Sequence, residues 1–222
     1  MKPETRLLLI ILIIGLILRF LYLDTSYVFW DESIYLMQGN EIMGIPAGYT
    51  EFLWRPPLVS FIVAPFSLFS DYVMASKIIM VFLSSFLMLA AYHLGRETSP
   101  ITGLLSSFIV AVHPQLIHMA SWVMTDTLVA IFGLYSLYFF HRGLMQRNRN
   151  LIIMGGIFIG FAFLTKFNAL IFLILTLPIF FRFRSRWKDI MASLFFGILI
   201  AIPYFAWHFL KFGGPFNGVF TS

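Results

Sequence analysis

The sequence predicts an all-α polytopic membrane protein. Of its 222 residues, 60% are hydrophobic and only 11% are charged, whereas a soluble domain carries roughly 25% charged residues. Long apolar runs recur between short polar clusters, and runs of about 17–25 apolar residues can cross a bilayer as helices. The chain therefore has too few charged side chains to cover itself in water, which argues against a soluble domain.

Six apolar stretches define the elements that we expect in chain order. They lie at Leu7–Leu23, Pro57–Ser70, Tyr72–Leu94, Ile101–His141, Leu151–Phe181 and Ile190–Leu210. As a single helix, the fourth stretch would reach about 60 Å, against a hydrocarbon core of about 30 Å. It is therefore expected to form a hairpin around its polar point, Ser121–Asp126. The fifth stretch is either one helix of about 46 Å or two short helices that turn at Thr165–Asn168.

The distribution of basic residues bears on the number of spans. The basic clusters are Lys2/Arg6, Arg96, Arg142/Arg147/Arg149 and Arg182/Arg184/Arg186/Lys188. Basic loops favour the cytoplasmic side of a membrane, and all four clusters reach that side only if an even number of spans separates each pair. This condition requires a turn at Lys166 and makes Pro57–Ser70 a re-entrant or interfacial segment.

We therefore expect about seven transmembrane helices in a single module over residues 1–222, located in the cell membrane with a cytoplasmic N-terminus. An eight-span arrangement, in which Pro57–Ser70 crosses, would place the first basic cluster opposite the others. The net charge of +5 comes from clusters that flank apolar runs, so it does not indicate a nucleic-acid partner. The chain has no cysteine, which excludes disulfides and thiolate metal sites.

The loop at 24–57 is the longest polar segment, and we expect it on the outer side with short interfacial helices. It contains Trp30–Asp31–Glu32–Ser33–Ile34–Tyr35. Adjacent carboxylates at a membrane surface suit general base catalysis or cation binding. They equally suit the first turn of a helix, where acids interact favourably with the helix dipole. If Asp31 begins such a helix, Tyr35 lies one turn later on the same face.

Three further charged residues stand out. Asp126 lies within an apolar stretch, where a carboxylate at mid-membrane depth costs roughly 2.5–3.5 kcal/mol; at the tip of a hairpin it would instead be in water. Lys166 and Arg55 are cations on the acidic outer side. Lys166, at a tight turn between two short helices, either extends to the surface or receives an anion. Arg55 precedes Pro56–Pro57, which favours an extended backbone there.

Several short motifs occur one after another along almost the whole chain. They are Arg19; Asp31, Glu32 and Tyr35; Arg55, Pro56 and Pro57; Pro114 and Asp126; Leu164, Thr165 and Lys166; and Phe212, Gly213 and Pro215. With these motifs in this order, the chain resembles the membrane glycosyltransferases of the type C fold that use polyprenyl-phosphate sugars. These include the dolichyl-phosphate-mannose–protein mannosyltransferases and the lipid A aminoarabinose transferases. Many relatives carry basic residues where this chain has Ile34 and Ser121.

The resemblance implies an inverting transfer of a sugar from a polyprenyl-phosphate donor to an acceptor hydroxyl on the outer face. The acceptor would be a protein or a lipid, and the site would contact membrane lipids. The implied catalytic residues are Asp31 as the base, Glu32 and Asp126; the implied substrate-binding residues are Arg55, Lys166, Tyr35 and Arg19. No metal ligand and no cofactor other than the donor lipid is implied, and a divalent metal stays open. A Gly-rich nucleotide-binding loop does not occur, which agrees with a lipid-linked donor.

Relatives of this kind are longer, so the chain is expected to be the N-terminal part of a longer fold, with 24–57 as its outer catalytic loop. Two other functions stay open. A small transporter or lipid carrier would use Asp126 and Lys166 as buried pathway residues. A non-catalytic subunit or fragment would need a partner chain to supply the remainder of a site.

Overall fold

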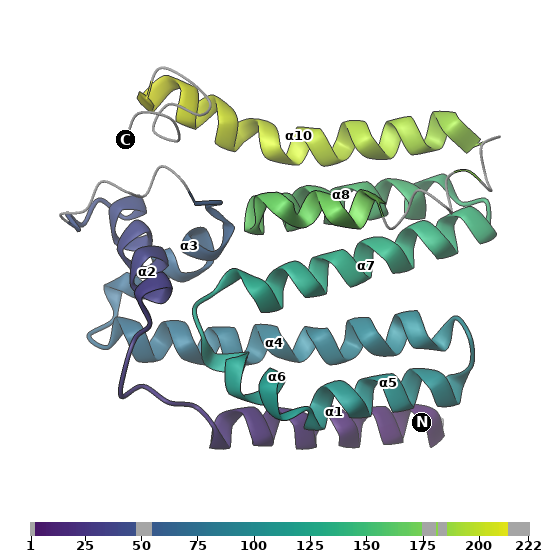
Figure 1. The fold of residues 1–222 in the computed structure, drawn as a ribbon, viewed down its shortest axis with the longest axis horizontal. Helices are drawn as coiled ribbons and strands as arrows, with labels where there is room; N and C mark the ends of the chain where they lie inside the picture. The colour runs from purple at the N-terminus through teal and green to yellow at the C-terminus, as the bar shows by residue number, and fades with distance from the viewer. Residues whose placement is uncertain (1–2, 48–54, 175–180, 182–185, 213–222) are drawn as a thin grey trace.

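The computed structural model of the chain describes residues 3–47, 55–174, 181 and 186–212. Within these residues every regular element is a helix (Figure 1). The long elements are α1 (Pro3–Leu21), α4 (Tyr72–Arg96), α5 (Pro100–Val112), α7 (Thr125–Met145), α8 (Arg149–Thr165) and α10 (Trp187–Phe212). The other elements are α2 (Trp30–Ile42), α3 (Leu58–Val63), η2 (Ala64–Leu68), α6 (Pro114–His118), η3 (Met119–Ser121) and η4 (Phe167–Leu170).

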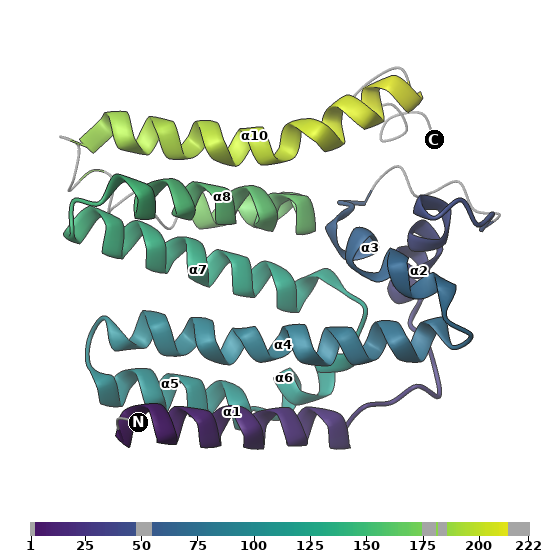
Figure 2. The ribbon, with the colours of Figure 1, turned by 180° about the vertical axis from the view of Figure 1, so that it is seen from behind.

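The long helices run roughly side by side, and neighbours in the chain pack against one another. Helices α1, α4 and α5 form one group, α7 packs on α4, α8 on α7, and α10 on α8 (Figure 2). One core cluster joins α2, α3, α4 and α7 through buried side chains that include Tyr35, Val63, Met80 and Ile131. Helices α2 and α3 are therefore packed onto the bundle itself.

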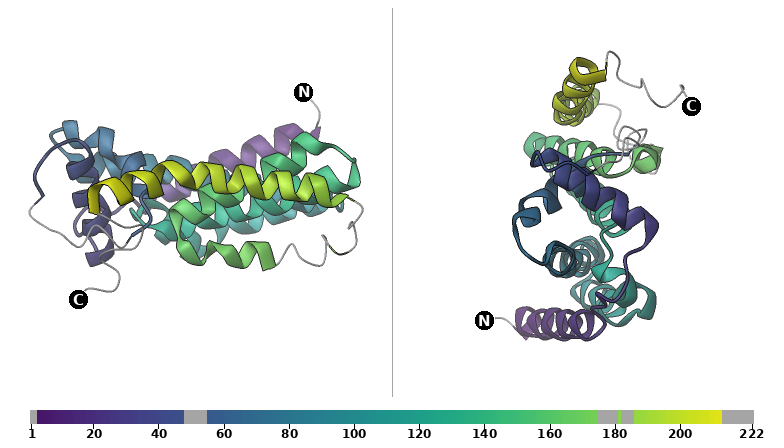
Figure 3. Two further views of the ribbon diagram at one scale, coloured as in Figure 1. Left: turned by 90° about the horizontal axis from the view of Figure 1, so that it is seen from above. Right: turned by 90° about the vertical axis from the view of Figure 1, so that its left-hand side faces the viewer.

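Helices α2 and α3 lie together at one end of the bundle, as the end view in Figure 3 shows. Helix α2 crosses the direction of the long helices there, and α3 contacts α8. The element formed by α3 and η2 covers only Leu58–Leu68, about 16 Å as a helix, which is too short to cross a hydrocarbon core. This agrees with the predicted re-entrant or interfacial segment.

Local sequence signals explain where several helices begin. The side chain of Asp71 accepts a hydrogen bond from the Met74 N–H at 2.9 Å and caps α4. Ser99 caps α5 by accepting from the Thr102 N–H at 3.1 Å, and Pro100 occupies the first helical position. Asn148 caps α8 in the same way, through the N–H of Asn150.

Both predicted hairpins have their breaks where the sequence placed them. Helix η3 ends at Ser121 and α7 begins at Thr125, while α8 ends at Thr165. After the second break the chain is helical again through η4 and on to residue 174. Residues 175–180 of the expected returning helix lie outside the described residues, as do the loop segment 48–54, Arg182, Arg184, Gly213 and Pro215.

Three described helices are long and apolar enough to cross a membrane: α4, α7 and Trp187–Leu210 of α10. The pair of Pro100–Val112 and Pro114–Ser121, bent by 60°, makes a fourth if it counts as one span. Helix α1 has sufficient length but carries Glu4, Arg6 and Arg19, and α8 is shorter, at 17 residues. The structure supports an all-α membrane protein with three to four candidate spans, and the predicted number of seven is not established.

The helix ends that carry Arg96, Arg142 and Arg149 gather at the end of the bundle opposite α2 and α3 (Figure 1). Arg96 at the end of α4 forms an ion pair with Glu4 of α1. Arg149 at the start of α8 pairs with Asp189 of α10, and Arg142 of α7 lies 3.8 Å from the carboxylate of Glu97. The ends of five helices thus share one charged surface, which matches the pattern of basic residues that the sequence shows.

Candidate functional site

Asp31 and Arg55 form an ion pair at the end of the bundle that carries α2 and α3. Asp31 is in the first turn of α2, and Arg55 lies just before the proline pair that leads into α3. The Arg55 Nη2 atom lies 2.5 Å from the Asp31 Oδ1 atom, and the two side chains keep 28% and 46% of their surface exposed. Both groups are therefore paired and still accessible to a ligand from solvent.

Tyr35 lies one turn after Asp31 in α2, as the helical spacing predicts. The Arg55 guanidinium lies over its ring, 5.3 Å from the centroid. Burial lowers the pKa of Arg55, but hydrogen bonds with Asp31 and Tyr35 raise it more, so the net shift is upward. Arg55 is a permanent cation held in place by a carboxylate and an aromatic ring.

A second ion pair forms between Asp126 and Lys166, at 2.8 Å, with 46% and 38% of the side-chain surfaces exposed. Asp126 lies in the first turn of α7, and Lys166 directly follows the last residue of α8. An acid near a helix N-terminus and a base near a helix C-terminus each interact favourably with the helix dipole. The hairpin tip at Ser121–Asp126 and the break at Lys166 therefore meet at one exposed ion pair.

Glu32 faces away from Asp31, into the protein, and has no exposed surface. Its Oε2 atom accepts a hydrogen bond from the Phe29 N–H at 2.9 Å, and its Oε1 atom accepts from the Val123 N–H at 2.7 Å. The side chain thus caps the start of α2 and joins it to the segment before α7. The two adjacent carboxylates have different environments, with Asp31 at the surface and Glu32 buried.

Lys77 of α4 is the cation that the sequence analysis did not select. Its Nζ atom lies 3.7 Å from the Glu32 carboxylate, and the two side chains are 1% and 0% exposed. The same atom donates to the backbone carbonyls of Asp24 and Tyr27, at 2.8 and 2.9 Å. The sequence did contain a signal that could have identified Lys77: it is a lone lysine within the apolar stretch Tyr72–Leu94, and a charge placed there needs a partner.

Arg19 does not join either ion pair. Its guanidinium is buried where α1 meets the break between α5 and α6, and it donates to the carbonyls of Gly15, Val110 and Ala111. The carbonyl of Val110 has no helical donor, because residue 114 is proline and has no N–H. Arg19 supplies the missing hydrogen bond, so the structure places this predicted substrate-binding residue at a helix break.

The topology brings the two exposed ion pairs to the same end of the molecule. Helix α2, the segment before α3, the start of α7 and the end of α8 all lie there (Figures 1 and 2), and α3 contacts α8 directly. Each pair is neutral as a unit, since it joins one acid to one base. Among the described residues, no three His, Asp or Glu side chains are grouped in a way that could hold a metal ion.

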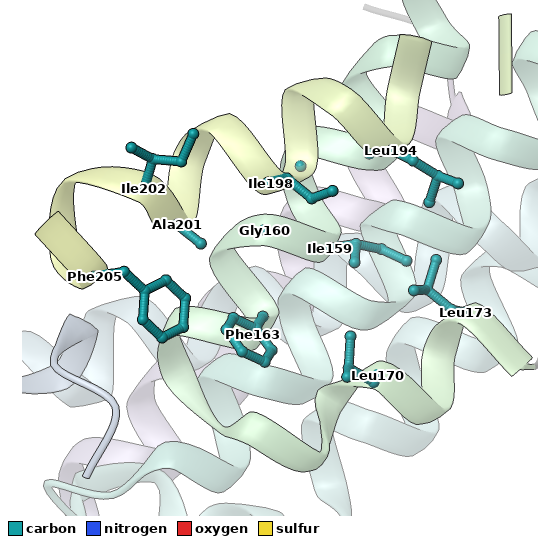
Figure 4. A pocket seen from close by; sticks show the side chains of 12 residues that line it. Ile159, Gly160, Phe163, Leu170, Leu173, Leu194, Ile198, Ala201, Ile202 and Phe205 are labelled. Atoms are coloured by element: carbon teal, nitrogen blue, oxygen red, sulfur yellow. The ribbon is translucent and has the colours of Figure 1, made fainter. Parts of the chain in front are cut away.

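An apolar hollow of about 380 Å³ lies beside the Lys166 turn, between α8, the segment 167–174 and α10. Figure 4 shows Phe163 and Leu170, three residues before and four residues after Lys166, pointing into it. Gly156 and Gly160 let α8 approach α10 closely: a Cβ atom on Gly156 would lie 1.9 Å from the Ser193 carbonyl oxygen. A smaller hollow of about 260 Å³ is lined by Pro57 and by residues of α3, α8 and α10.

Comparison with known proteins gives one match. A family model described as dolichyl-phosphate-mannose-protein mannosyltransferase matches residues 54–208. The matched region contains Arg55, Asp126 and Lys166, and it begins after Asp31 and Glu32. Neither the comparison with curated proteins nor the comparison with solved structures finds a match.

Proposed function

This chain belongs to the dolichyl-phosphate-mannose-protein mannosyltransferase family, and from that premise we propose that it transfers a sugar from a polyprenyl-phosphate-linked donor to an acceptor hydroxyl. The membership makes it a membrane glycosyltransferase of the mannosyltransferase type. The observation that carries the finer proposal is the exposed ion pair of Asp31 and Arg55, 2.5 Å apart. It sets a carboxylate that can act as a base directly beside a permanent cation.

The two ion pairs support a site for a lipid phosphate. Arg55 and Lys166 lie at the same end of the bundle, and each is paired with a carboxylate. A phosphate group is an anion that can replace those carboxylates as the partner of both cations. Binding of the donor would then release Asp31 from Arg55 and free it to accept a proton.

The chemistry that follows is a single displacement. The acceptor oxygen forms a bond to the anomeric carbon, the bond from that carbon to the phosphate oxygen breaks, and the configuration at the carbon inverts. Asp31 takes the proton of the attacking hydroxyl as general base. The lipid phosphate leaves with added negative charge, which Arg55 and Lys166 stabilise as preorganised cations. Asp126 holds Lys166 in position until the phosphate arrives.

The hollow between α8, the segment 167–174 and α10 supports a place for the lipid part of the donor. Its lining is apolar, and it begins within four residues of Lys166. A polyprenyl chain would pack there by van der Waals contact, as apolar groups do inside a bilayer, while its phosphate stays at the cation. The donor would enter with its tail among the helices and its sugar toward Asp31.

The charges support an orientation for this site. Arg96, Arg142 and Arg149 lie at the end opposite Asp31 and Arg55, and basic loops favour the cytoplasmic side. The site therefore belongs on the outer face of the membrane. A carrier that uses Asp126 and Lys166 as buried pathway residues fits less well, since more than a third of each side chain is exposed.

The test is sugar transfer by the purified protein in proteoliposomes with a radiolabelled polyprenyl-phosphate sugar. Asp31→Asn keeps the size of the side chain and removes its basicity. We expect transfer to fall by about 10²–10⁴-fold, the contribution of general base catalysis, with donor binding retained. Glu97→Gln, which changes an acid at the opposite end, is the matched control. Turnover equal to that of the parent in Asp31→Asn would remove Asp31 as the base.

A further inference from the structure

Lys77 and Glu32 form a buried ion pair that the proposed transfer reaction does not use directly. The Lys77 ammonium donates two hydrogen bonds, to the carbonyls of Asp24 and Tyr27, and has the carboxylate of Glu32 as its counter-ion at 3.7 Å. The Tyr27 ring lies over the same ammonium, 5.6 Å from Nζ to the centroid. The segment between α1 and α2 is thereby fastened to α4.

Glu32 extends this link to α7. Its carboxylate connects the N-terminus of α2, through the Phe29 N–H, to the Val123 N–H. Val123 is three residues before Asp126, and Glu32 directly follows Asp31 in the chain. The rings of Phe29 and Trp122, 4.5 Å apart, pack beside the same junction. One buried carboxylate therefore joins the two segments that carry the exposed acids.

We propose that Lys77 and Glu32 are positioning residues that fix the segment of Asp31 relative to the segment of Asp126. This inference rests on the proposed function of those two acids. It assigns Glu32 a role inside the protein in place of the catalytic role that the resemblance implied, because both of its oxygens accept backbone hydrogen bonds and neither faces solvent. Neither Lys77 nor Glu32 touches substrate in this arrangement.

The expected effect of breaking the pair is on turnover. Lys77→Met keeps a linear side chain and removes the charge and the hydrogen-bond donors. We expect kcat to fall by about 10²-fold, the cost of a displacement of about 1 Å at a reacting group, while KM for the lipid donor stays unchanged because Arg55 and Lys166 are intact. Lys77→Arg, which keeps a cation and several donors, should restore most of kcat. Lys188→Met, at an exposed lysine, is the control.

A second readout does not depend on activity. Because the chain contains no cysteine, the variant with Phe29→Cys and Trp122→Cys carries the only two thiols. A short bis-maleimide should link them quickly when Lys77 is present and slowly in the Lys77→Met background. Where Lys77→Met does not fold, Glu32→Gln provides the comparison, since it retains the size and one acceptor of the side chain.

The outcomes are distinct. Folded Lys77→Met or Glu32→Gln protein with the kcat and the crosslinking rate of the parent overturns the positioning role. An equal loss of kcat in Lys77→Arg, with unchanged crosslinking, also contradicts it. A parent protein without transferase activity contradicts the proposed function instead, and the crosslinking rates still decide whether the pair holds the two segments together.

Discussion

Arg19 donates a hydrogen bond to the carbonyl of Val110, 3.1 Å away and on another helix. The carbonyl is free to accept this bond because Pro114 has no N–H to donate to it. The helix α5 ends at Val112, and the next residue, His113, has the extended backbone that a following proline favours. A charged side chain in an apolar bundle is thus explained by the polar backbone groups that a proline leaves unpaired. The 60° bend between Pro100–Val112 and Pro114–Ser121 lies at the same break.

This contact predicts a coupling between Arg19 and Pro114. Arg19→Leu should lower the free energy of unfolding by about 1–3 kcal/mol, the cost of leaving a buried polar group without a partner. Pro114→Ala restores an N–H at residue 114, so the cost of Arg19→Leu should be smaller in that background. Thermal unfolding of the four proteins in detergent measures the coupling. If Arg19→Leu costs the same in the parent and in Pro114→Ala, Arg19 does not compensate for the missing N–H of Pro114.

The two exposed cations predict how donor binding responds to mutation. Arg55→Ala and Lys166→Ala should each weaken binding of a polyprenyl phosphate by about 1.5–3 kcal/mol, the range for hydrogen bonds to charged groups. Binding can be measured by titration with a fluorescent polyprenyl phosphate in nanodiscs. Arg96→Ala is the matched control, because Arg96 is also an ion-paired arginine but lies at the opposite end. Unchanged binding in both variants and in the double variant would rule out this phosphate site.

The raised pKa of Arg55 predicts how its contribution to stability varies with pH. A cation whose pKa is raised on folding contributes stability below its unfolded pKa and loses it only as the pH rises through the folded value. That value lies far above working conditions, so the stability difference between the parent and Arg55→Gln should stay constant from about pH 6 to pH 10. Melting temperatures of both proteins across this range test the point. A difference that disappears within the range would show that another group controls the pair.

The arrangement of charges predicts the sidedness of the membrane protein. Single cysteines at Thr25 and Gln146 lie at opposite ends of the bundle, and both residues are exposed. Since the parent has no cysteine, a membrane-impermeant maleimide should label Thr25→Cys in intact cells and Gln146→Cys only after permeabilisation. External labelling of Gln146→Cys would reverse the proposed orientation.

Apolar run lengths and charge positions were enough to predict the helical membrane class, the hairpin at Ser121–Asp126 and the break at Lys166. These are local properties: a run too long for the bilayer has to turn, and it turns where polar residues can reach water. The α2 helix with Asp31 in its first turn follows from the same kind of local signal. The number of spans does not, because α1 and α8 combine apolar faces with charges or shorter lengths.

The partners of the charged residues were decided by the tertiary structure alone. Asp31 and Arg55 are 24 positions apart, Asp126 and Lys166 are 40 apart, and Glu32 and Val123 are 91 apart. Adjacent acids look equivalent in a sequence, yet packing exposes Asp31 and buries Glu32 against Lys77. The reason is physical: a charge removed from water requires a partner, and which partner reaches it depends on how distant helices pack, which no local pattern specifies.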